Sequence, residues 1–269
     1  MAVIVRSWNL FHGNVVPVER RTHIERMVRV AAADRPDVLC LQEVPVWALA
    51  RLGEWSGMAA VGEVAQPPRF GPFPITAAAG KALTQIDYGL FRSAFSGQAT
   101  AILLGERTRV LSRSTLVLND RAFRRAQAVQ LDLPPLARLA WAKERRTAQV
   151  LRVALPDGRT AVLANLHASS YRPDDRLADA ELLRAAVYAT AEADTDELIV
   201  IAGDFNVTAA RSATFEELRG WGFDGGGPWI DHVVVRNGEP GPVEAWRDTR
   251  RRVGRALLSD HAPVEVTIR

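Results

Sequence analysis

The sequence repeatedly places a short apolar run directly before a polar side chain, and this pattern limits the folds open to the chain. The clearest run, residues 198–202, is wholly apolar and is followed by Gly203, Asp204 and Asn206. Such a run predicts a strand covered on both faces of its sheet. The same order recurs in five other segments, at residues 7–9, 41–43, 165–167, 230–232 and 259–261. Strands that end in polar groups predict a cleft at the edge of a sheet.

Strand-like and helical segments alternate along the chain. The apolar runs predict strands at residues 3–7, 37–43, 99–104, 110–118, 147–155, 160–167, 198–202, 230–235 and 264–268. The strands at 99–104 and 110–118 are expected to be neighbours. Helical periodicity predicts helices at residues 19–34, 45–57 and 174–193. Residues 62–98, which contain many Gly and Pro, are expected to be mostly loop, with a strand near residues 87–91.

Turn and capping signals refine this order. Asp157-Gly158 stands between two apolar runs, which is a strong signal for a β-hairpin. Thr214 and Glu217 fit a capping box that opens a short helix, and Gly220 closes it. Hairpins argue for antiparallel pairing, and interspersed helices argue for helices layered on sheets. The pattern favours an α/β sandwich with substantially antiparallel sheets over a doubly wound parallel sheet.

The length and the composition are those of one domain. The chain has 269 residues, 48% of them hydrophobic, and no change of composition divides it. We therefore expect a single domain, residues 1–269. No apolar run approaches the ~20 residues that span a bilayer, and no basic segment followed by an apolar segment and a cleavage site opens the chain. A cytoplasmic protein without membrane insertion is expected.

Cysteine content and charge give weaker signals. Cys40, the only cysteine, lies within an apolar run and is interpreted as a small buried side chain rather than a nucleophile. The formal net charge is +3, a weak signal for nucleic acid. Almost all basic residues are arginine, because Lys81 and Lys143 are the only lysines. Codon bias is the plain explanation, although arginine also binds phosphate through two parallel hydrogen bonds.

Three residues that follow predicted strands suit phosphate chemistry. Asp204 and Asn206 are two positions apart, so both point to the same side of an extended chain. Asp204 can orient or deprotonate a water molecule, and Asn206 can donate its amide to a phosphoryl oxygen. Glu43 supplies the kind of oxygen ligand that Mg²⁺ prefers. Taken singly, each residue also fits an ordinary turn or strand end.

The histidines differ in their surroundings. His261 follows Asp260, so the carboxylate can bind a metal ion while the imidazole faces the phosphate. Asp231 can fix the tautomer of His261 and raise its pKa. His167 ends an apolar run, where a histidine is more often structural. Structural roles are expected for His12 in a Gly/Asn turn, for His23 on a predicted helix, and for His232 beside Asp231.

Taken together and in this order, the motifs resemble those of the endonuclease/exonuclease/phosphatase superfamily, which has the deoxyribonuclease-I-like fold. The resemblance spans residues 3–269, and its most specific parts are Leu-Gln-Glu at 41–43, Gly-Asp-Phe-Asn at 203–206 and Ser-Asp-His at 259–261. It implies a four-layer α/β sandwich, with two mixed, largely antiparallel sheets packed face to face and helices outside. It places the site at one edge of the two sheets.

The resemblance also implies a role for each matching residue. Glu43 would bind Mg²⁺ or Mn²⁺ with support from Asn9, and Asp260 would be a second ligand. Asp204 would position or deprotonate the water, and Asn206 would contact the scissile phosphate. His261, oriented by Asp231, would stabilise the charge that develops on the phosphate during in-line attack of water on phosphorus.

The sequence departs from one branch of this superfamily at two positions. Apurinic endonucleases carry a carboxylate two residues after the first Asn, where this chain has Phe11. They carry Tyr at the position of His167. His167 matches the branch of deoxyribonuclease I, sphingomyelinases and several phosphatases, in which it would contact the phosphate and assist the leaving group. An abasic-site enzyme is therefore not the expected activity.

The sequence says less about the substrate than about the fold or the site residues. Arginines crowd the segment before Asp260, and Arg251, Arg252 and Arg255 are expected to bind the phosphates of a nucleic-acid backbone if that loop lies at the cleft. A solvated loop is the plain alternative. The first hypothesis is a nuclease acting on DNA or RNA. The alternatives are a phosphatase or phosphodiesterase for a small or lipid phosphoester, and a non-catalytic binding protein. No long exposed apolar hairpin supports lipid, and no obligate protein partner is inferred.

Overall fold

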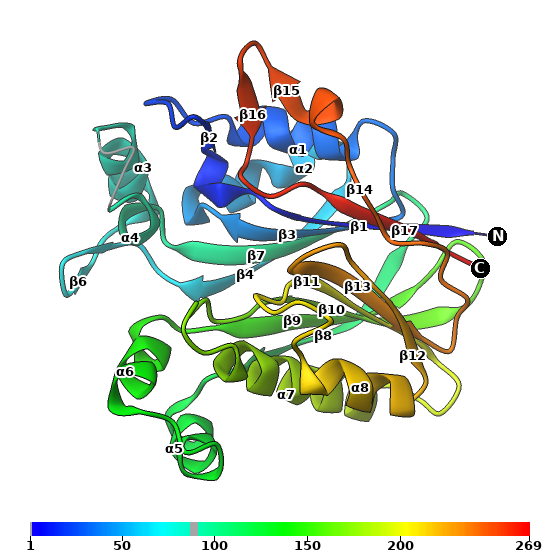
Figure 1. The fold of residues 1–269 in the computed structure, drawn as a ribbon. Helices are drawn as coiled ribbons and strands as arrows, with labels where there is room; N and C mark the ends of the chain where they lie inside the picture. The colour runs from blue at the N-terminus through cyan, green and yellow to red at the C-terminus, as the bar shows by residue number, and fades with distance from the viewer. Residues whose placement is uncertain (1, 87–90) are drawn as a thin grey trace.

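Two six-stranded sheets form the centre of the protein in the computed structural model, which describes residues 2–86 and 91–269 (Figure 1). The first sheet contains, in spatial order, β14 (Glu244–Ala245), β17 (Val264–Ile268), β1 (Val3–Asn9), β3 (Val38–Val44), β7 (Gln98–Leu104) and β4 (Ala59–Gln66). The second contains β12 (Phe223–Gly226), β13 (Asp231–Arg236), β11 (Leu198–Asp204), β10 (Thr160–His167), β9 (Thr147–Ala154) and β8 (Arg109–Val117). Both are mixed, because β1–β3 and β10–β11 are parallel and the other neighbouring pairs are antiparallel.

Helices cover the outer faces of the two sheets, which gives four layers (Figure 1). α1 (Ile24–Ala32) and α2 (Leu52–Ser56) pack on the first sheet. α7 (Arg176–Glu192) and α8 (Ala213–Gly220) pack on the second. The expected four-layer α/β sandwich is thus confirmed. Within the described ranges, no helix is long and apolar enough to cross a lipid bilayer.

Shorter elements surround this sandwich. At one end, on the left of Figure 1, lie two helical pairs, α3 (Ala77–Ile86) with α4 (Arg92–Ser96) and α5 (Arg121–Gln130) with α6 (Pro135–Lys143). Two small sheets consist of β15 (Arg252–Val253), β16 (Ala256–Leu258) and β2 (Val15–Val16), and of β5 (Arg69–Phe70) and β6 (Phe73–Pro74). Turns of 3₁₀ helix span Phe11–Gly13, Val46–Arg51 and Asp248–Arg251.

The apolar runs are continuous because both faces of the central strands are buried. In β3, Val38 and Cys40 pack in the core between the two sheets, whereas Leu39 and Leu41 pack against the outer helices. Successive strand residues point to opposite faces, so each face receives alternate side chains. The buried position of Cys40 confirms its interpretation as a core residue, and burial raises the pKa of its thiol to about 12.

Most predicted elements are confirmed, but the prediction for residues 62–98 is wrong. For every strand predicted outside that segment, both ends lie within two residues of the ends of an observed strand. Residues 62–98 contain the end of β4 and the helices α3 and α4. Gly80 was read as a loop signal, yet it lies within α3, where a Cβ atom would come within 2.2 Å of the Phe95 carbonyl oxygen. The glycine therefore permits close packing of two helices. The strand predicted near residues 87–91 falls mainly on residues 87–90, which lie outside the described ranges.

Two further details differ from the prediction. β7 and β8 are not neighbours, because β7 lies in the first sheet between β3 and β4, and β8 is an edge strand of the second sheet. A short connection can cross between two packed sheets as readily as it forms a hairpin. The short helix α8 begins one residue before Thr214, and its cap is Ser212, whose hydroxyl accepts the Phe215 N–H at 3.1 Å.

A pair of buried amides joins the two sheets. Gln42 on β3 donates its Nε2 to Asn165 Oδ1 on β10 at 2.8 Å. Asn165 in turn donates its Nδ2 to the carbonyl oxygens of Leu41 and Ala101, at 3.1 and 3.0 Å, both in the first sheet. Both side chains are completely buried. These bonds fix how the sheets are aligned, because a buried amide without its partner is costly.

We expect Asn165→Ala to lower the free energy of unfolding by about 2 kcal/mol or more, since each buried polar group left without a partner costs about 1–3 kcal/mol. Urea denaturation measures this loss. Thr160→Ala, at the exposed start of the same strand, is the control and should change the stability by less than about 0.5 kcal/mol. Equal effects of the two substitutions would contradict the role of the amide pair.

Candidate active site

Three chemically active side chains stand side by side at one edge of the second sheet. His167 at the end of β10 pairs in register with Asp204 at the end of β11, and Asp204 pairs with Asp231 at the start of β13. The close approach of β10 and β11 needs Gly203, because a Cβ atom there would lie 2.0 Å from the Leu166 carbonyl oxygen. The motif around Asp204 is thus held by backbone packing as well as by hydrogen bonds.

The first sheet contributes Asn9 and Glu43 to the same edge. The pairing of β3 with β7 shifts between Leu41 and Val44, and Glu43 has a left-handed φ of 50°. This bulge turns the Glu43 side chain out of the strand, as bulges beside functional sites commonly do. Asn9 then connects the two sheets, because its Nδ2 donates to Asp204 Oδ2 at 2.9 Å and to Glu43 Oε1 at 3.2 Å.

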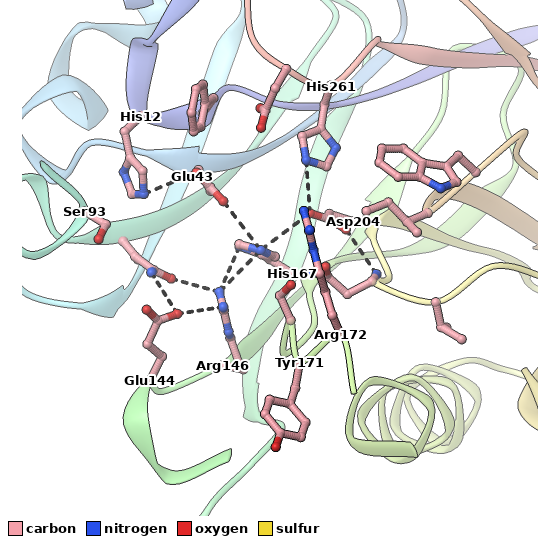
Figure 2. A pocket seen from close by; sticks show the side chains of 18 of the residues that line it. His12, Glu43, Ser93, Glu144, Arg146, His167, Tyr171, Arg172, Asp204 and His261 are labelled. Atoms are coloured by element: carbon pink, nitrogen blue, oxygen red, sulfur yellow. Dashed lines mark hydrogen bonds and ion pairs between the residues drawn. The ribbon is translucent and has the colours of Figure 1, made fainter. Parts of the chain in front are cut away.

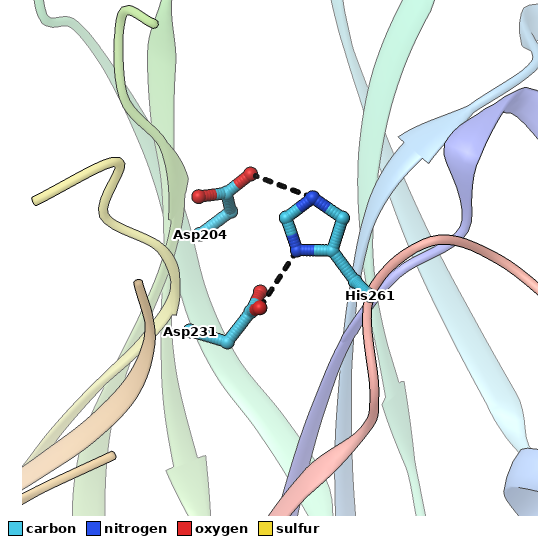
Figure 3. Close-up of side chains that lie close together, drawn as sticks. All are labelled: Asp204, Asp231 and His261. Carbon is cyan, nitrogen blue, oxygen red and sulfur yellow. Dashed lines mark hydrogen bonds and ion pairs between the residues drawn. The ribbon is translucent and has the colours of Figure 1, made fainter. Parts of the chain in front are cut away.

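The loop before β17 brings His261 to the second sheet. His261 Nδ1 lies 2.7 Å from Asp231 Oδ2, and its Nε2 lies 3.8 Å from Asp204 Oδ2 (Figure 3). Ser259 holds this loop: its hydroxyl donates to the Asn9 carbonyl at 2.7 Å and accepts the His261 N–H at 3.1 Å. Ser259 therefore holds His261 at its backbone N–H, and Asp231 holds it at its ring.

The neighbours of His261 keep it protonated. Burial lowers the pKa of His261, but the hydrogen bond and charge of Asp231, with Asp204 and Asp260, raise it to about 10. Burial, followed by the charge of Asp231, raises the pKa of Asp204, and His261 offsets part of this effect. Burial also raises the pKa of Asp260. The site therefore gathers carboxylates whose charge is only partly neutralised by one imidazolium.

His167 is neutral, in contrast to the protonated His261. Its Nε2 lies 3.5 Å from Asp204 Oδ2 and 3.7 Å from Glu43 Oε1, and its Nδ1 lies 3.0 Å from Arg146 Nη1 (Figure 2). Burial, and then the Arg146 charge, hold the pKa of His167 well below its ordinary value. Arg146 is itself held by Glu144 Oε2 at 2.7 Å and by Gln98 Oε1 at 2.9 Å. A neutral imidazole thus stands beside a buried guanidinium.

These groups face one cavity of about 1030 Å³. Glu43, His167, Asp204, Asn206, Asp260 and His261 line it, and Figure 2 shows several of their side chains converging from both sheets. Asn206 donates its Nδ2 to the Ala168 carbonyl at 3.0 Å, which leaves its second N–H available. Arg92 and Ser93 of α4 form another part of the wall.

The donor set suits a hard divalent cation. Oxygen atoms of Glu43, Asp204 and Asp260 line the cavity, and such ligands are those that Mg²⁺ takes in proteins. Ligand atoms of Asp204, Asp231 and His261 lie within 4.8 Å of one another, and Asp231 Oδ1 is buried without a partner among the described residues. Because His261 Nδ1 is already bonded to Asp231, the oxygen atoms are the better ligands.

The predicted arginines lie elsewhere. Arg251 is buried and donates its Nη1 to the carbonyl oxygens of Leu258 and Ser259, at 3.1 and 2.8 Å. It therefore supports the loop that carries His261. Arg252 and Arg255 are exposed on the small sheet around β15. The cavity wall instead includes Arg92, Arg146, Arg172 and Arg211. Contact of Arg251, Arg252 and Arg255 with substrate stays a prediction.

The three histidines that were expected to be structural have different surroundings. His232 is completely buried and its Nε2 contacts the Val207 carbonyl at 2.9 Å, and His23 contacts Glu19. The place of His12 at the cavity was missed: the residue lines the cavity wall, and its Nε2 lies 3.2 Å from Glu43 Oε2. Arg146, Glu144 and Gln98 were also missed. The one sequence signal for Arg146 is its place directly before a predicted strand.

The layered fold and this site define the class of the protein, a deoxyribonuclease-I-like α/β sandwich. The model of the Endonuclease/Exonuclease/phosphatase family matches residues 7–261, and the chain belongs to this family. Members of the family are phosphoester hydrolases and are generally metal-dependent. No curated protein matches the sequence.

Solved structures show the same fold at low identity. The endonuclease/exonuclease/phosphatase from Bacteroides vulgatus is 16% identical, with a TM-score of 0.67 over 100% of this chain and 99% of that chain. A functionally unknown conserved protein from Enterococcus faecalis V583 is 13% identical, with a TM-score of 0.68 over 99% of both chains. Truncated TDP2 from Caenorhabditis elegans is 15% identical, with a TM-score of 0.62 over 100% of this chain and 97% of that chain. At these identities, the likeness is one of fold alone.

We expect the His261 imidazole of the metal-free protein to titrate far above its ordinary pKa of 6.5, near 10. The folded-state pKa is raised, so the His261–Asp231 pair stabilises the fold fully below about pH 6.5 and loses that effect as the pH rises through 10. Asp231→Asn should lower this pKa, because burial then acts with less opposition. NMR titration of the histidine side chains measures both values, and an unchanged pKa in Asp231→Asn would contradict this account.

Proposed function

We propose that this chain is a Mg²⁺- or Mn²⁺-dependent phosphodiesterase that hydrolyses nucleic acid by in-line attack of water on phosphorus. One observation carries the proposal. In a single cavity, His167 lies 3.7 Å from Glu43 and 3.5 Å from Asp204, and Asp204 lies 3.8 Å from His261, so carboxylates and imidazoles from both sheets adjoin one another. A water molecule and a phosphate group bound there would contact all of these groups at once.

Asp204 is the residue proposed to act on the water. Its two oxygens accept the Asn206 N–H at 3.1 Å and the Asn9 amide at 2.9 Å, so the carboxylate has a fixed direction. A fixed carboxylate can orient the attacking water and accept its proton. The raised pKa of Asp204 suits a proton acceptor, because a more basic carboxylate takes the proton more readily.

His261, His167 and Asn206 are proposed to act on the phosphate. His261 is protonated and bonds Asp231 through Nδ1, so its Nε2–H is free to donate to a phosphoryl oxygen that gains charge. His167, neutral beside Arg146, is proposed to contact the phosphate near the leaving group. The second N–H of Asn206 is proposed to donate to the phosphate as well.

Glu43 and Asp260 are proposed to hold the metal ion, with support from Asn9. The Asn9 amide donates to Glu43 and to Asp204, and thereby keeps two carboxylates together. A bound divalent ion supplies positive charge that offsets the charge developing on the phosphate. Burial raises the pKa of Asp204 and of Asp260, so a cation bound at this place would stabilise their charged forms.

Nucleic acid is the proposed substrate because cationic and aromatic side chains occur together on the cavity wall. Arg146, Arg172 and Arg211 provide positive charge for phosphates on either side of the scissile one. Trp229, which is 61% exposed, lies beside His261 with 6.4 Å between ring centroids. An exposed aromatic ring beside the site offers a stacking surface for a base. Arg252 and Arg255 are proposed as more distant phosphate contacts.

We also propose that residues 1–269 act as one domain, in the cytoplasm and without an obligate protein partner. Both sheets contribute to one apolar core, which includes Val5 and Ile268 from the first sheet and Leu163 and Val200 from the second. A core shared by both ends of the chain supports a single folding unit.

A lipid phosphoester is the second candidate, and one observation favours it. The hairpin of β5 and β6 exposes Phe70 and Phe73, at 58% and 69% of their surface. Exposed aromatic side chains on a short hairpin suit insertion into a lipid surface. This hairpin was not expected, because its two strands have only two residues each and leave no recognisable pattern in the sequence.

Hydrolysis of plasmid DNA, single-stranded DNA, RNA and bis-p-nitrophenyl phosphate, each with Mg²⁺, Mn²⁺ or EDTA, tests the function. We expect metal-dependent cleavage of at least one polymer and none in EDTA. Asp204→Asn and His261→Ala should each lower turnover ~10²-fold or more, because each removes a group that acts in the transition state. Asp196→Asn, an exposed carboxylate outside the cavity, is the matched control. Near-native turnover of Asp204→Asn would refute the proposed mechanism.

Phe70→Ser together with Phe73→Ser separates the two substrate classes. If the substrate is nucleic acid, the double variant should cleave it as fast as the unchanged protein. If the substrate is a lipid phosphoester, the variant should lose activity on phospholipid vesicles but keep its activity on a water-soluble ester. The comparison of vesicle and soluble substrates in one assay gives the answer.

A further inference from the structure

His12 occupies a position that the chemistry proposed above does not use. The side chain is buried between α4 and the end of β3. Its Nδ1 lies 3.0 Å from Ser96 Oγ. Its Nε2 lies 3.2 Å from Glu43 Oε2, and Figure 2 shows His12 and Glu43 facing each other. Asn9 contacts the other oxygen of the same carboxylate, Glu43 Oε1. Both oxygens of Glu43 therefore have a neighbour that holds them.

The backbone is strained where it presents this side chain. Phe11 and His12 have φ values of 47° and 51°, in the left-handed region that residues other than glycine rarely adopt. Hydrogen bonds hold the turn, because Asn9 Oδ1 accepts the Phe11 N–H at 2.9 Å and the Leu10 carbonyl accepts the Gly13 N–H at 2.7 Å. Strain of this kind concentrates at functional sites, where the surrounding structure maintains it.

The contacts of His12 define the direction of its hydrogen bonds. With a proton on Nε2, the ring presents an N–H toward Glu43 Oε2, and its Nδ1 faces the Ser96 hydroxyl, which also lies 3.2 Å from the Gly97 carbonyl. Without that proton, a nitrogen lone pair would face a carboxylate oxygen at 3.2 Å. In the first arrangement, the two ring nitrogens of His12 face Ser96 and Glu43 with complementary groups.

We infer that His12 is a positioning residue that orients the Glu43 carboxylate for the metal ion. This inference rests on the proposed function. Asn9 and His12 each hold one oxygen, so the carboxylate cannot rotate freely before the ion binds. Each carboxylate oxygen can still take a second partner, which leaves room for a metal bond. Partners that orient a ligand in this way change metal affinity by about 10–100-fold when they are removed.

Mn²⁺ binding to the metal-free protein, measured by calorimetry or by electron paramagnetic resonance, tests the inference without an activity assay. His12→Asn keeps a residue type that tolerates the left-handed backbone, but its side chain is too short to reach Glu43. We expect the Kd for Mn²⁺ to rise about 10–100-fold. His12→Gln, whose terminal amide can donate from a place close to the imidazole Nε2, should recover most of the affinity.

Three comparisons make the outcome decisive. His23→Asn changes another buried histidine, which contacts Glu19 outside the cavity, and should leave the Kd unchanged. Ser96→Ala keeps the turn intact and removes the partner of Nδ1, so it should weaken binding by a smaller factor.

If His12→Asn folds and binds Mn²⁺ as tightly as the unchanged protein, the inference is overturned and the proposed function stands. If His12→Asn does not fold, an unchanged Kd in Ser96→Ala overturns it. Failure of the unchanged protein to bind Mn²⁺ overturns both.

Discussion

The site depends on the fixed alignment of two sheets, and the buried contact between Gln42 and Asn165 secures that alignment. These amides meet at 2.8 Å across the interface, and Asn165 also donates to two backbone carbonyls of the first sheet. Hydrogen bonds in a buried region have a strict geometry, because a slipped sheet would leave the groups unpaired. Gln42 directly precedes Glu43, and Asn165 is two residues before His167 on the same strand. The contact that joins the sheets therefore also sets the distance between active groups.

Two imidazoles in one cavity are held in opposite protonation states. Asp231 bonds His261 and keeps it charged, whereas burial and the Arg146 guanidinium keep His167 neutral. The sheet register places His167 beside Asp204, and Asp204 beside Asp231. The two imidazoles therefore have different nearest neighbours, which set their different protonation states. Such divergence of similar groups is how one site can both donate and accept protons.

The sequence predicted the site better than its surroundings, for a physical reason. Asp204, Glu43 and His261 follow or precede strongly apolar strands, and the ends of strands are fixed by burial of those strands. The helices α3 and α4 were missed because the many Gly and Pro of that segment were read as loop signals, whereas Gly80 serves close helix packing. Arg251 is buried against the carbonyls of its own loop, and its expected contact with substrate stays a prediction. Charge in a sequence does not tell which way a side chain points.

The order of strands along the chain, their two-sided burial and the chemical groups at their ends could be predicted from the sequence, because apolar periodicity and residue type are local properties. The tertiary structure establishes which strands are neighbours, as the separation of β7 and β8 into different sheets shows. It also decided that a bulge turns Glu43 into the cavity and that a strained turn brings His12 to the same carboxylate. These outcomes depend on packing between residues far apart in sequence, and no local pattern records them.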